Sequence, residues 1–491
     1  MVNTDNFFLE YSRMINKMIP VIGVLNSQKI ETIISYNNTS VENWINDLNM
    51  LKGKYKSDRL YTRLIDARIF EQKELNELTN NPMFWVDNTL SAISANWRAK
   101  VLINNAEVLR CNINLLASSF PDRIKELKSY ETKFSRVMGQ KALSKIRREL
   151  EIISNFNDNF RLIEQDTLEK ISLFSKELSD VIEDKCSDNP LIIPLNEKEI
   201  SHYIYLTFGI KMDFSLLKID LENLIKNLSG GYIYVKEEPK NFSDEDIMLV
   251  IQDIISCFLK EEIDYFSFID TIKILKNKNR LNAKAEMTSY IKDIGSDGNY
   301  VGFLSIDGYN IDIERLKLKL VHEVFPGHHY QSSVLKNDKN ICFTNSMLDE
   351  GWAKYAEFLY IKRRSNKKCS SYFLSSFRAI AISVYAMILL NVDNMNISEI
   401  ADELTRKFDI SLVSAKNIIL MEYMDPLSSI SYYIGFHTFL YFLKDFPISN
   451  VEEIKFNMRK VYSLFLLDGY EADYKDIRKF NLDEALKKIY I

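Results

Sequence analysis

One stretch decides how this chain is interpreted, and it runs Val321-His322-Glu323-Val324-Phe325-Pro326-Gly327-His328-His329-Tyr330-Gln331. Three of the protein's five histidines fall within it, and the first of them is followed by a glutamate. Clustered imidazoles beside a carboxylate are typical of a zinc site in which the carboxylate acts as a base. The stretch therefore predicts a Zn²⁺ site.

The spacing of the histidines requires a break in the helix. In the common His-Glu-x-x-His pattern, the two histidines lie four residues apart on one helix face. Here that position is Pro326, and in an unbroken helix His328 would point about 120° away from His322 and sit roughly 9 Å further along the axis. Pro326 and Gly327 can interrupt the helix, because proline lacks a backbone donor and glycine accepts unusual dihedrals. A break would bring either His328 or His329 back toward His322.

A second motif supplies an acidic ligand, and it runs Leu348-Asp349-Glu350-Gly351-Trp352-Ala353-Lys354-Tyr355-Ala356-Glu357. Glu350 follows His322 by twenty-eight residues, which leaves room for a loop and a second helix. Glu357 lies seven residues further, nearly on the same helix face. One glutamate would bind the metal while the other orients a histidine N–H.

The two motifs, His-Glu-x-x-Pro-Gly-His-x-x-Gln and Glu-Gly-Trp-Ala-x-Tyr-Ala-Glu, resemble those of the bacterial domain-of-unknown-function 885 family. Its members are regarded as zincin-like metallopeptidases related in architecture to thimet-oligopeptidase-like enzymes. A short early segment, Asn81–Trp85, is also similar to an Asn-Pro-aromatic segment of the family. The resemblance implies a mainly α fold of the two-lobed, zincin-like, helical metallopeptidase type.

The resemblance also implies roles for individual residues. His322, His328 and Glu350 correspond to the metal ligands, and Glu323 corresponds to the base that activates water. Because His328 directly follows Pro-Gly, as the family's ligand does, the resemblance favours it over His329.

A late segment, Pro426–Gly435, resembles a family segment Pro-Gly-Gln-x-x-Ser-Tyr-x-x-Gly. This makes Tyr432 a candidate donor to the oxyanion, although Tyr432 and Tyr433 would serve equally well as core aromatics. The Gly-Gln of the family segment is replaced here by Leu427-Ser428.

A further departure follows Arg378, where the family's Asp-x-Gly-x-His is replaced by Tyr385-Ala386-Met387-Ile388-Leu389. Arg378 and Tyr385 are weaker candidates for substrate contact, since an arginine beside a core helix more often pairs with an internal acid. If the changed positions face the cleft, the protein should favour an apolar or modified amide over generic peptides.

Composition favours helices and argues against several partners. The 491 residues include only 9 Pro and 14 Gly, and most of the glycines lie between Gly209 and Gly351, where loops and strands are expected. A net charge of -5 without a basic stripe argues against nucleic acid. The five cysteines are scattered and lack Cys-x-x-Cys spacing, which argues against a disulfide framework.

The sequence also predicts a cytoplasmic protein with no membrane partner. Met1–Glu10 lacks the basic region and apolar core of a signal peptide. The most apolar run, Ala379–Leu390, has twelve residues and is too short to cross a bilayer. We expect this run to be a buried helix.

Turn signals at Asp188–Pro194 predict a boundary between an N-terminal helical lobe, 1–190, and a catalytic lobe, 191–491. In the first lobe, apolar residues from Leu143 to Leu178 recur at helical spacing and predict one long helix or two in line. Capping boxes are expected at Thr39-x-x-Glu42 and Asn396-x-x-Glu399.

The second lobe should contain a small antiparallel β-sheet beside the metal helix. Three segments rich in β-branched and aromatic residues predict its strands: 231–235, 285–291 and 300–306. The last strand would end shortly before the His322 helix and offer an edge to an extended peptide.

Three functions remain open. The first is a zinc-dependent hydrolase that cleaves a peptide or amide bond with water activated by Glu323. The second is a metal-dependent tailoring enzyme that acts on one small peptide-like metabolite. The third is a non-catalytic helical binding protein, against which Glu323 argues because a structural zinc site needs no base. For both enzymes the partner is a peptide or an amide-containing small molecule, and the sequence predicts no oligomeric state.

Overall fold

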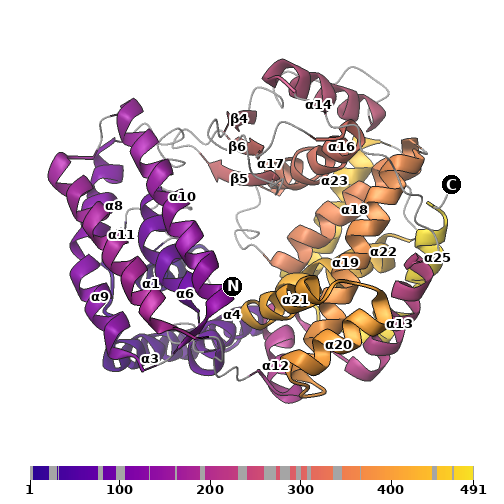
Figure 1. The fold of residues 1–491 in the computed structure, drawn as a ribbon. Helices are drawn as coiled ribbons and strands as arrows, with labels where there is room; N and C mark the ends of the chain where they lie inside the picture. Colours follow the sequence, from indigo (N-terminus) through magenta and orange to yellow (C-terminus); the bar gives the residue numbers. More distant parts are fainter. Residues whose placement is uncertain are drawn as a thin grey trace. The chain divides into compact units, whose positions relative to one another are not determined.

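The fold comes from a computed structural model, and the chain divides into two compact units that are each described by themselves. Unit 1 comprises Met1–Ile193 with Asp293–Asn299, and unit 2 comprises Pro194–Lys292 with Tyr300–Ile491. Both are mainly helical (Figure 1). The structure describes residues 4–20, 30, 32–75, 81–94, 106–131, 133–160, 163–187, 194–229, 240, 242–258, 272–276, 288–294, 300–306, 311–335, 345–364, 366–444, 450–466 and 469–489.

Unit 1 is built from amphipathic helices whose apolar faces meet in a core rich in aromatic residues. Phe7 stacks on Tyr61, with ring centroids 3.9 Å apart, and Phe120 stacks on Phe174 at 3.8 Å. Its elements are α1 (Thr4–Met18), α3 (Asn38–Lys54), α4 (Arg59–Phe70), η1 (Glu71–Leu75), α6 (Pro82–Val86), η2 (Asp87–Ser91), α8 (Ala106–Ser118), α9 (Phe120–Ser129), β1 (Phe134–Ser135), α10 (Arg136–Phe160), α11 (Gln165–Lys185) and β2 (Cys186–Ser187).

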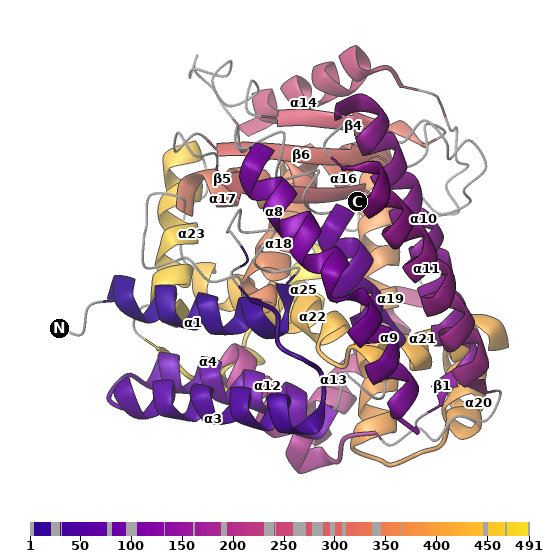
Figure 2. The same cartoon turned by 90° about the vertical axis from the view of Figure 1, so that its left-hand side faces the viewer.

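The long apolar pattern from Leu143 to Leu178 forms two helices, but they are not in line. α10 and α11 pack against one another, and Figure 2 shows them running side by side. The short parallel pair β1 and β2 joins the start of α10 to the end of α11. The expectation of collinear helices was wrong because periodicity records a buried face and does not record a turn between two helices that share it.

Of the two expected capping boxes, one is confirmed. Asn396 accepts from the backbone of Glu399, and the Glu399 side chain accepts in return. At the other expected site, Thr39-x-x-Glu42, the cap lies two residues earlier. Helix α3 begins at Asn38 and is capped by Asn37, whose side chain accepts from Ser40 N. Asparagine is at least as good an N-cap as threonine, so the earlier residue caps the helix.

Unit 2 surrounds a core of long helices. α18 packs most extensively against α22, and α19 packs against α13, α21 and α22. The elements are α12 (Glu197–Phe208), β3 (Ile210–Lys211), α13 (Phe214–Ser229), α14 (Asp244–Phe258), β4 (Ile272–Lys276), β5 (Thr288–Ile294), β6 (Tyr300–Ile306), α16 (Ile313–Glu323), α17 (His328–Leu335), α18 (Ser346–Arg364), α19 (Lys367–Asn391), α20 (Ile397–Phe408), α21 (Leu412–Met424), α22 (Ser428–Leu443), α23 (Val451–Leu466), β7 (Ala472–Asp473), α24 (Tyr474–Ile477) and α25 (Leu482–Lys487).

The backbones of α18 and α22 touch where two glycines meet. A Cβ on Gly351 would lie 2.3 Å from the carbonyl carbon of Gly435, and a Cβ on Gly435 would lie 2.0 Å from Met347 O. Neither position has room for a side chain. Trp352 and Tyr355 pack against Phe439 beside this contact. The crossing fixes α18 and α22 relative to one another.

The expected antiparallel sheet is corrected in two respects. The strand order is β4-β6-β5, and β4 pairs with β6 in parallel register. Because β6 therefore has a neighbour on each side, it offers no edge for strand addition. The short segment Ile272–Lys276 was missed because Lys273 interrupts its few apolar residues and Lys276 ends it. Of the expected strands, 300–306 is confirmed as β6, and residues 288–291 of the expected 285–291 lie in β5. Residues 231–235 and 285–287 lie outside the described residues.

The apolar run Ala379–Leu390 belongs to α19, a helix of 25 residues. Its length and composition would suffice to cross a membrane, so the argument from a twelve-residue run was wrong. Within unit 2, 67% of its most apolar window is buried. Such burial is what a core helix of a folded unit shows, as expected for this run.

Candidate metal centre

The helix breaks where Pro326 and Gly327 predict. α16 ends at Glu323, and α17 begins at His328. A Cβ on Gly327 would lie 1.8 Å from His322 O, so only glycine allows the chain to pass this close to the end of α16. The four residues between the helices turn the chain so that the first residue of α17 lies beside His322.

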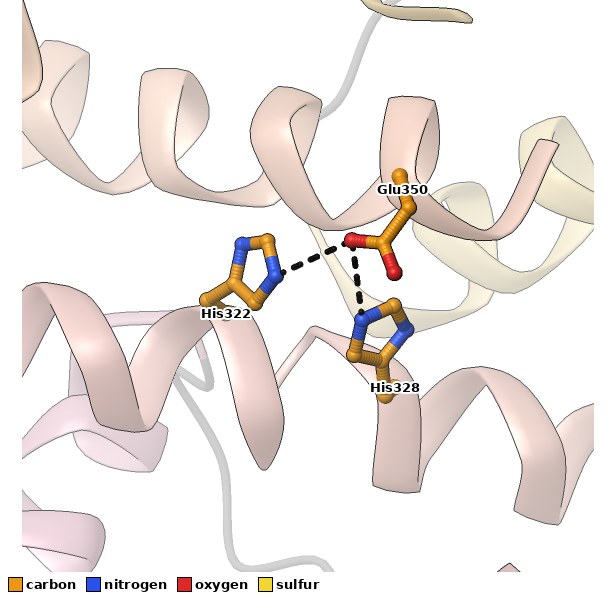
Figure 3. A group of neighbouring side chains, drawn as sticks. All are labelled: His322, His328 and Glu350. Atoms are coloured by element: carbon orange, nitrogen blue, oxygen red, sulfur yellow. Dashed lines mark ion pairs between the residues drawn. The ribbon is translucent and has the colours of Figure 1, made fainter. Parts of the chain in front are cut away.

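Three side chains from three helices converge at this break (Figure 3). Glu350 Oε2 of α18 lies 3.3 Å from His322 Nε2 and 3.5 Å from His328 Nε2. One ligand atom from each residue lies within 4.8 Å of the other two, and no other such group occurs among the described residues. The imidazole rings are nearly perpendicular, at 88°, so their Nε2 atoms approach the carboxylate from different directions.

His322 is oriented by a buried acidic residue. Its Nδ1 lies 2.7 Å from Oε1 of Glu357. Glu357 follows Glu350 in α18 by seven residues, about two helical turns. Lys354 Nζ lies 2.9 Å from the same oxygen and also donates to Ser376 Oγ of α19. Burial alone would raise the pKa of Glu357, but the Lys354 charge and the His322 hydrogen bond outweigh it and lower the pKa. The carboxylate therefore accepts from Nδ1–H and leaves Nε2 free to bind a metal.

His328 is oriented by a neutral amide. Its Nδ1 lies 3.3 Å from Gln331 Oε1. Gln331 Nε2 donates to Asp349 Oδ1 at 2.5 Å and to the Tyr462 hydroxyl, which itself donates to Asp349. Because both Nε2 hydrogens are used in this way, the amide oxygen faces His328 and accepts from Nδ1–H. His328, like His322, presents the lone pair of Nε2 toward Glu350.

This donor set fits a divalent cation. Two imidazole lone pairs and a carboxylate oxygen would face one another at close range, an arrangement that needs positive charge between them. Glu350 Oε2 is also buried without a hydrogen bond of its own. Burial lowers the pKa of His322, but the neighbouring Glu350 and Glu357 carboxylates outweigh it and raise the pKa to about 10. The site thus stabilises a cation, and two histidines with one glutamate are the ligands of catalytic zinc sites.

Glu323 and Tyr432 lie beside the ligands. Glu323 ends α16 and is 8% exposed, and burial raises its pKa, which suits a proton acceptor near neutral pH. The Tyr432 ring stacks over His322 with centroids 6.2 Å apart. Burial and then the Glu350 charge raise the pKa of Tyr432, so its hydroxyl stays protonated and able to donate.

The remaining candidates lie away from this cluster or are already engaged. His329 is fully buried and is not part of the group around Glu350. Arg378 donates to the carbonyl of Phe408. The Tyr385 hydroxyl donates to Glu222 and accepts from Lys407.

Four positions at which the chain departs from the family pattern are buried in helix packing: Tyr385, Met387, Leu389 and Leu427. Their side chains therefore give no support to the expectation that they line a substrate pocket. The preference for an apolar amide stays a prediction.

The sequence reasoning missed two supporting residues, Lys354 and Tyr462. Lys354 is three residues before Glu357, and this helical spacing is a signal that could have identified the pair. Tyr462 lies 131 residues after Gln331, and no local pattern connects them.

Two solved structures share the fold of nearly the whole chain. One is a "putative lipoprotein" from Colwellia psychrerythraea, with a TM-score of 0.62, 12% identity, and coverage of 99% of this chain and 98% of that one. The other is a "putative lipoprotein of unknown function" from Shewanella oneidensis, with a TM-score of 0.57, 11% identity, and coverage of 94% and 99%. The sequence matches no known family model and no curated protein. At such low identity the likeness shows a shared, mainly helical fold and nothing about activity.

Proposed function

We propose that this protein is a zinc-dependent hydrolase that cleaves a peptide or amide bond. One observation carries the proposal: Nε2 of His322 and Nε2 of His328 lie 3.3 and 3.5 Å from Glu350 Oε2, while the Nδ1 of each ring faces an acceptor oxygen, that of Glu357 or Gln331. The assignment to a zincin-like metallopeptidase fold is part of the same proposal. It rests on the two motifs around His322 and Glu350 and on the resemblance that they carry.

The residues around the ligands have separate roles. Bound zinc would supply a Lewis acid that polarises the scissile carbonyl and lowers the pKa of water. Glu323 would accept the proton of the attacking water and deliver it to the leaving amine. The Tyr432 hydroxyl would donate a hydrogen bond to the carbonyl oxygen as negative charge develops on it. A site that only held zinc for stability would not need the buried Glu323, and this disfavours a binding protein.

Metal content and turnover test the proposal separately. Wild-type protein should contain about one zinc per chain, and His322→Ala or Glu350→Ala should lose it. Glu323→Gln should keep its zinc while kcat falls by about 10²-fold or more on whichever peptide or amide substrate a library screen identifies. Full zinc occupancy in both ligand variants, or wild-type turnover by Glu323→Gln, would reject the assigned roles.

The cellular location is a separate part of the proposal. The two proteins with a similar fold are each described as a "putative lipoprotein", so the comparisons do not support the cytoplasmic location expected from the sequence. We propose a membrane-associated location as the alternative. Fractionation of cells that make the native chain distinguishes the two, because a cytoplasmic protein stays in the soluble fraction after the membranes are sedimented.

A further inference from the structure

The two histidines of the candidate metal centre have different groups behind them. Glu357 lies behind His322, and Gln331 lies behind His328. A carboxylate offers an acceptor whichever way it turns, whereas an amide has an oxygen that accepts and a nitrogen that donates. The orientation of the Gln331 amide therefore decides which kind of group His328 meets.

Only one of the two amide orientations suits a metal ligand. In the structure, Gln331 Oε1 lies 3.3 Å from His328 Nδ1, so Nδ1 carries the hydrogen and Nε2 keeps its lone pair. In the reversed amide, the NH₂ group would face Nδ1, and the hydrogen of a neutral ring would move to Nε2. Nε2 lies 3.5 Å from Glu350 Oε2 and would then donate to this carboxylate instead of binding a metal.

Asp349 and Tyr462 hold the amide in the orientation that suits the metal. Gln331 Nε2 donates to Asp349 Oδ1 at 2.5 Å and to the Tyr462 hydroxyl. The hydroxyl uses its own hydrogen for Asp349 Oδ1, at 2.8 Å. Reversal would place the amide oxygen against the carboxylate, so that two acceptors face each other, and it would remove the donor to the hydroxyl lone pair.

These hydrogen bonds lie where bulk water cannot easily replace them. Gln331 and Tyr462 are 4% and 1% exposed, so solvent does not simply take over a bond that is lost there. A separate contact also holds α23 to α17, because Arg459 donates to the Val334 carbonyl at 2.9 Å. Removal of the Tyr462 hydroxyl alone should therefore leave the two helices packed.

We propose that Tyr462 is a positioning residue of the metal centre, which acts with Asp349 to fix the Gln331 amide and so keeps His328 Nε2 available to the metal. This inference rests on the proposed zinc site and adds to it a residue that lies outside both sequence motifs. Asp349 directly precedes Glu350, so α18 supplies one ligand and, through Gln331, orients another.

Zinc affinity of the full-length protein, measured by competition with a chromophoric chelator, tests the proposal. Tyr462→Phe keeps the ring but removes the hydroxyl, and it should weaken zinc binding by about tenfold or more. Tyr474→Phe is the matched control. Tyr474 is also fully buried, and its hydroxyl donates to the carboxylate of Asp220 at 2.9 Å, but it does not contact the residues around the metal centre. This variant should bind zinc as the wild type does.

Cobalt substitution separates positioning from a general loss of stability. The visible absorption bands of Co²⁺ depend on the identity and the geometry of its ligands. The Co²⁺-loaded Tyr462→Phe variant should therefore have a changed spectrum, because His328 is no longer held in one orientation. The spectrum of Tyr474→Phe should match that of the wild type.

An exchange of the two polar groups tests the direction of the hydrogen bonds. Asp349→Asn removes the carboxylate that accepts from Gln331, and it should weaken zinc binding by about tenfold or more. The addition of Gln331→Glu returns a carboxylate to the pair, and this group accepts from His328 Nδ1–H in either orientation. The double variant should recover zinc affinity to within about threefold of the wild type.

The outcomes separate this inference from the proposed function. The roles of Tyr462 and Asp349 are overturned, with the zinc site left intact, by wild-type zinc affinity in Tyr462→Phe, by an unchanged cobalt spectrum, or by a double variant that binds zinc no better than Asp349→Asn. A wild-type protein that binds no zinc would instead overturn the proposed function, and this inference with it.

Discussion

Two buried glutamates of unit 2 have opposite electrostatic environments. Glu357 and Glu422 are 4% and 2% exposed. Glu357 has Lys354 and His322 as partners, and these lower its pKa despite its burial. Glu422 has only the Ser429 hydroxyl at 2.5 Å, its Oε2 makes no hydrogen bond, and burial raises its pKa to about 8.

Burial therefore does not decide whether a carboxyl group is charged; its partners do. Glu357 is held ionised at a position where its carboxylate accepts a hydrogen bond from His322 Nδ1–H. Glu422 is held protonated near neutral pH because no cation among the described residues compensates its charge. The difference also separates a glutamate that orients a proposed metal ligand from one that is only packed in the fold.

The largest expected effect comes from removing the cation beside Glu357. Lys354→Met should lower the free energy of unfolding by about 3–5 kcal/mol, because it leaves Glu357 buried without its counter-charge. Urea denaturation monitored by circular dichroism measures the loss. Lys362→Met, on the exposed face of α18, is the matched control and should change stability little.

The double variant Lys354→Met with Glu357→Gln sharpens this comparison. If the penalty comes from an uncompensated charge, neutralising that charge should restore a large part of the lost stability. A double variant no more stable than Lys354→Met would mean that the packing of the lysine side chain, and not its charge, is what stabilises the unit.

A smaller effect is expected for zinc binding. Glu357→Gln should weaken zinc affinity by about 10 to 100-fold, since a neutral amide is a poorer acceptor for His322 Nδ1–H. Competition with a chromophoric chelator measures this affinity. Glu422→Gln is the control and should bind zinc as the wild type does. Equal affinities in all three proteins would exclude Glu357 from the support of the metal site.

The smallest effect concerns pH. Between the usual glutamate pKa of 4.5 and the pKa of about 8 in the folded protein, Glu422 binds more proton in the folded than in the unfolded state. Its contribution to the free energy of unfolding therefore falls as pH rises through this window. Glu422→Gln should lose less stability than the wild type between pH 5.5 and 8.5 in urea denaturation. A steeper loss in the variant would show that Glu422 is ionised in the folded protein.

Local spacing in the sequence was sufficient to predict the centre of the candidate site. The position of Pro326-Gly327 between His322 and His328 predicted a broken helix, because no unbroken helix could bring the two imidazoles together. The Asn396 cap and the mainly helical class follow from equally local rules. In each case the decisive residues lie within one or two helical turns of each other.

Relations between distant segments could not be predicted in this way. The parallel pairing of β4 with β6 depends on the order of the strands in the sheet, and the composition of a strand does not determine its neighbours. The hydrogen bond from Gln331 to the Tyr462 hydroxyl joins α17 to α23, two helices that lie far apart in the sequence. Tyr385 was a weak candidate for substrate contact because of its place in a motif, and its hydroxyl is engaged by Glu222 and Lys407 from two other helices.

The glycine contact between α18 and α22 fixes the distance between two residues of the proposed active site. Glu350 precedes Gly351, and Tyr432 lies three residues before Gly435, so the touching backbones set the separation of the carboxylate and the phenol. Reacting groups must be held within about 0.5 Å of their productive geometry. A methyl group at either glycine would push the two helices apart by more than about 0.5 Å. The alignment of the proposed reacting groups therefore depends on two glycines that have no side chain.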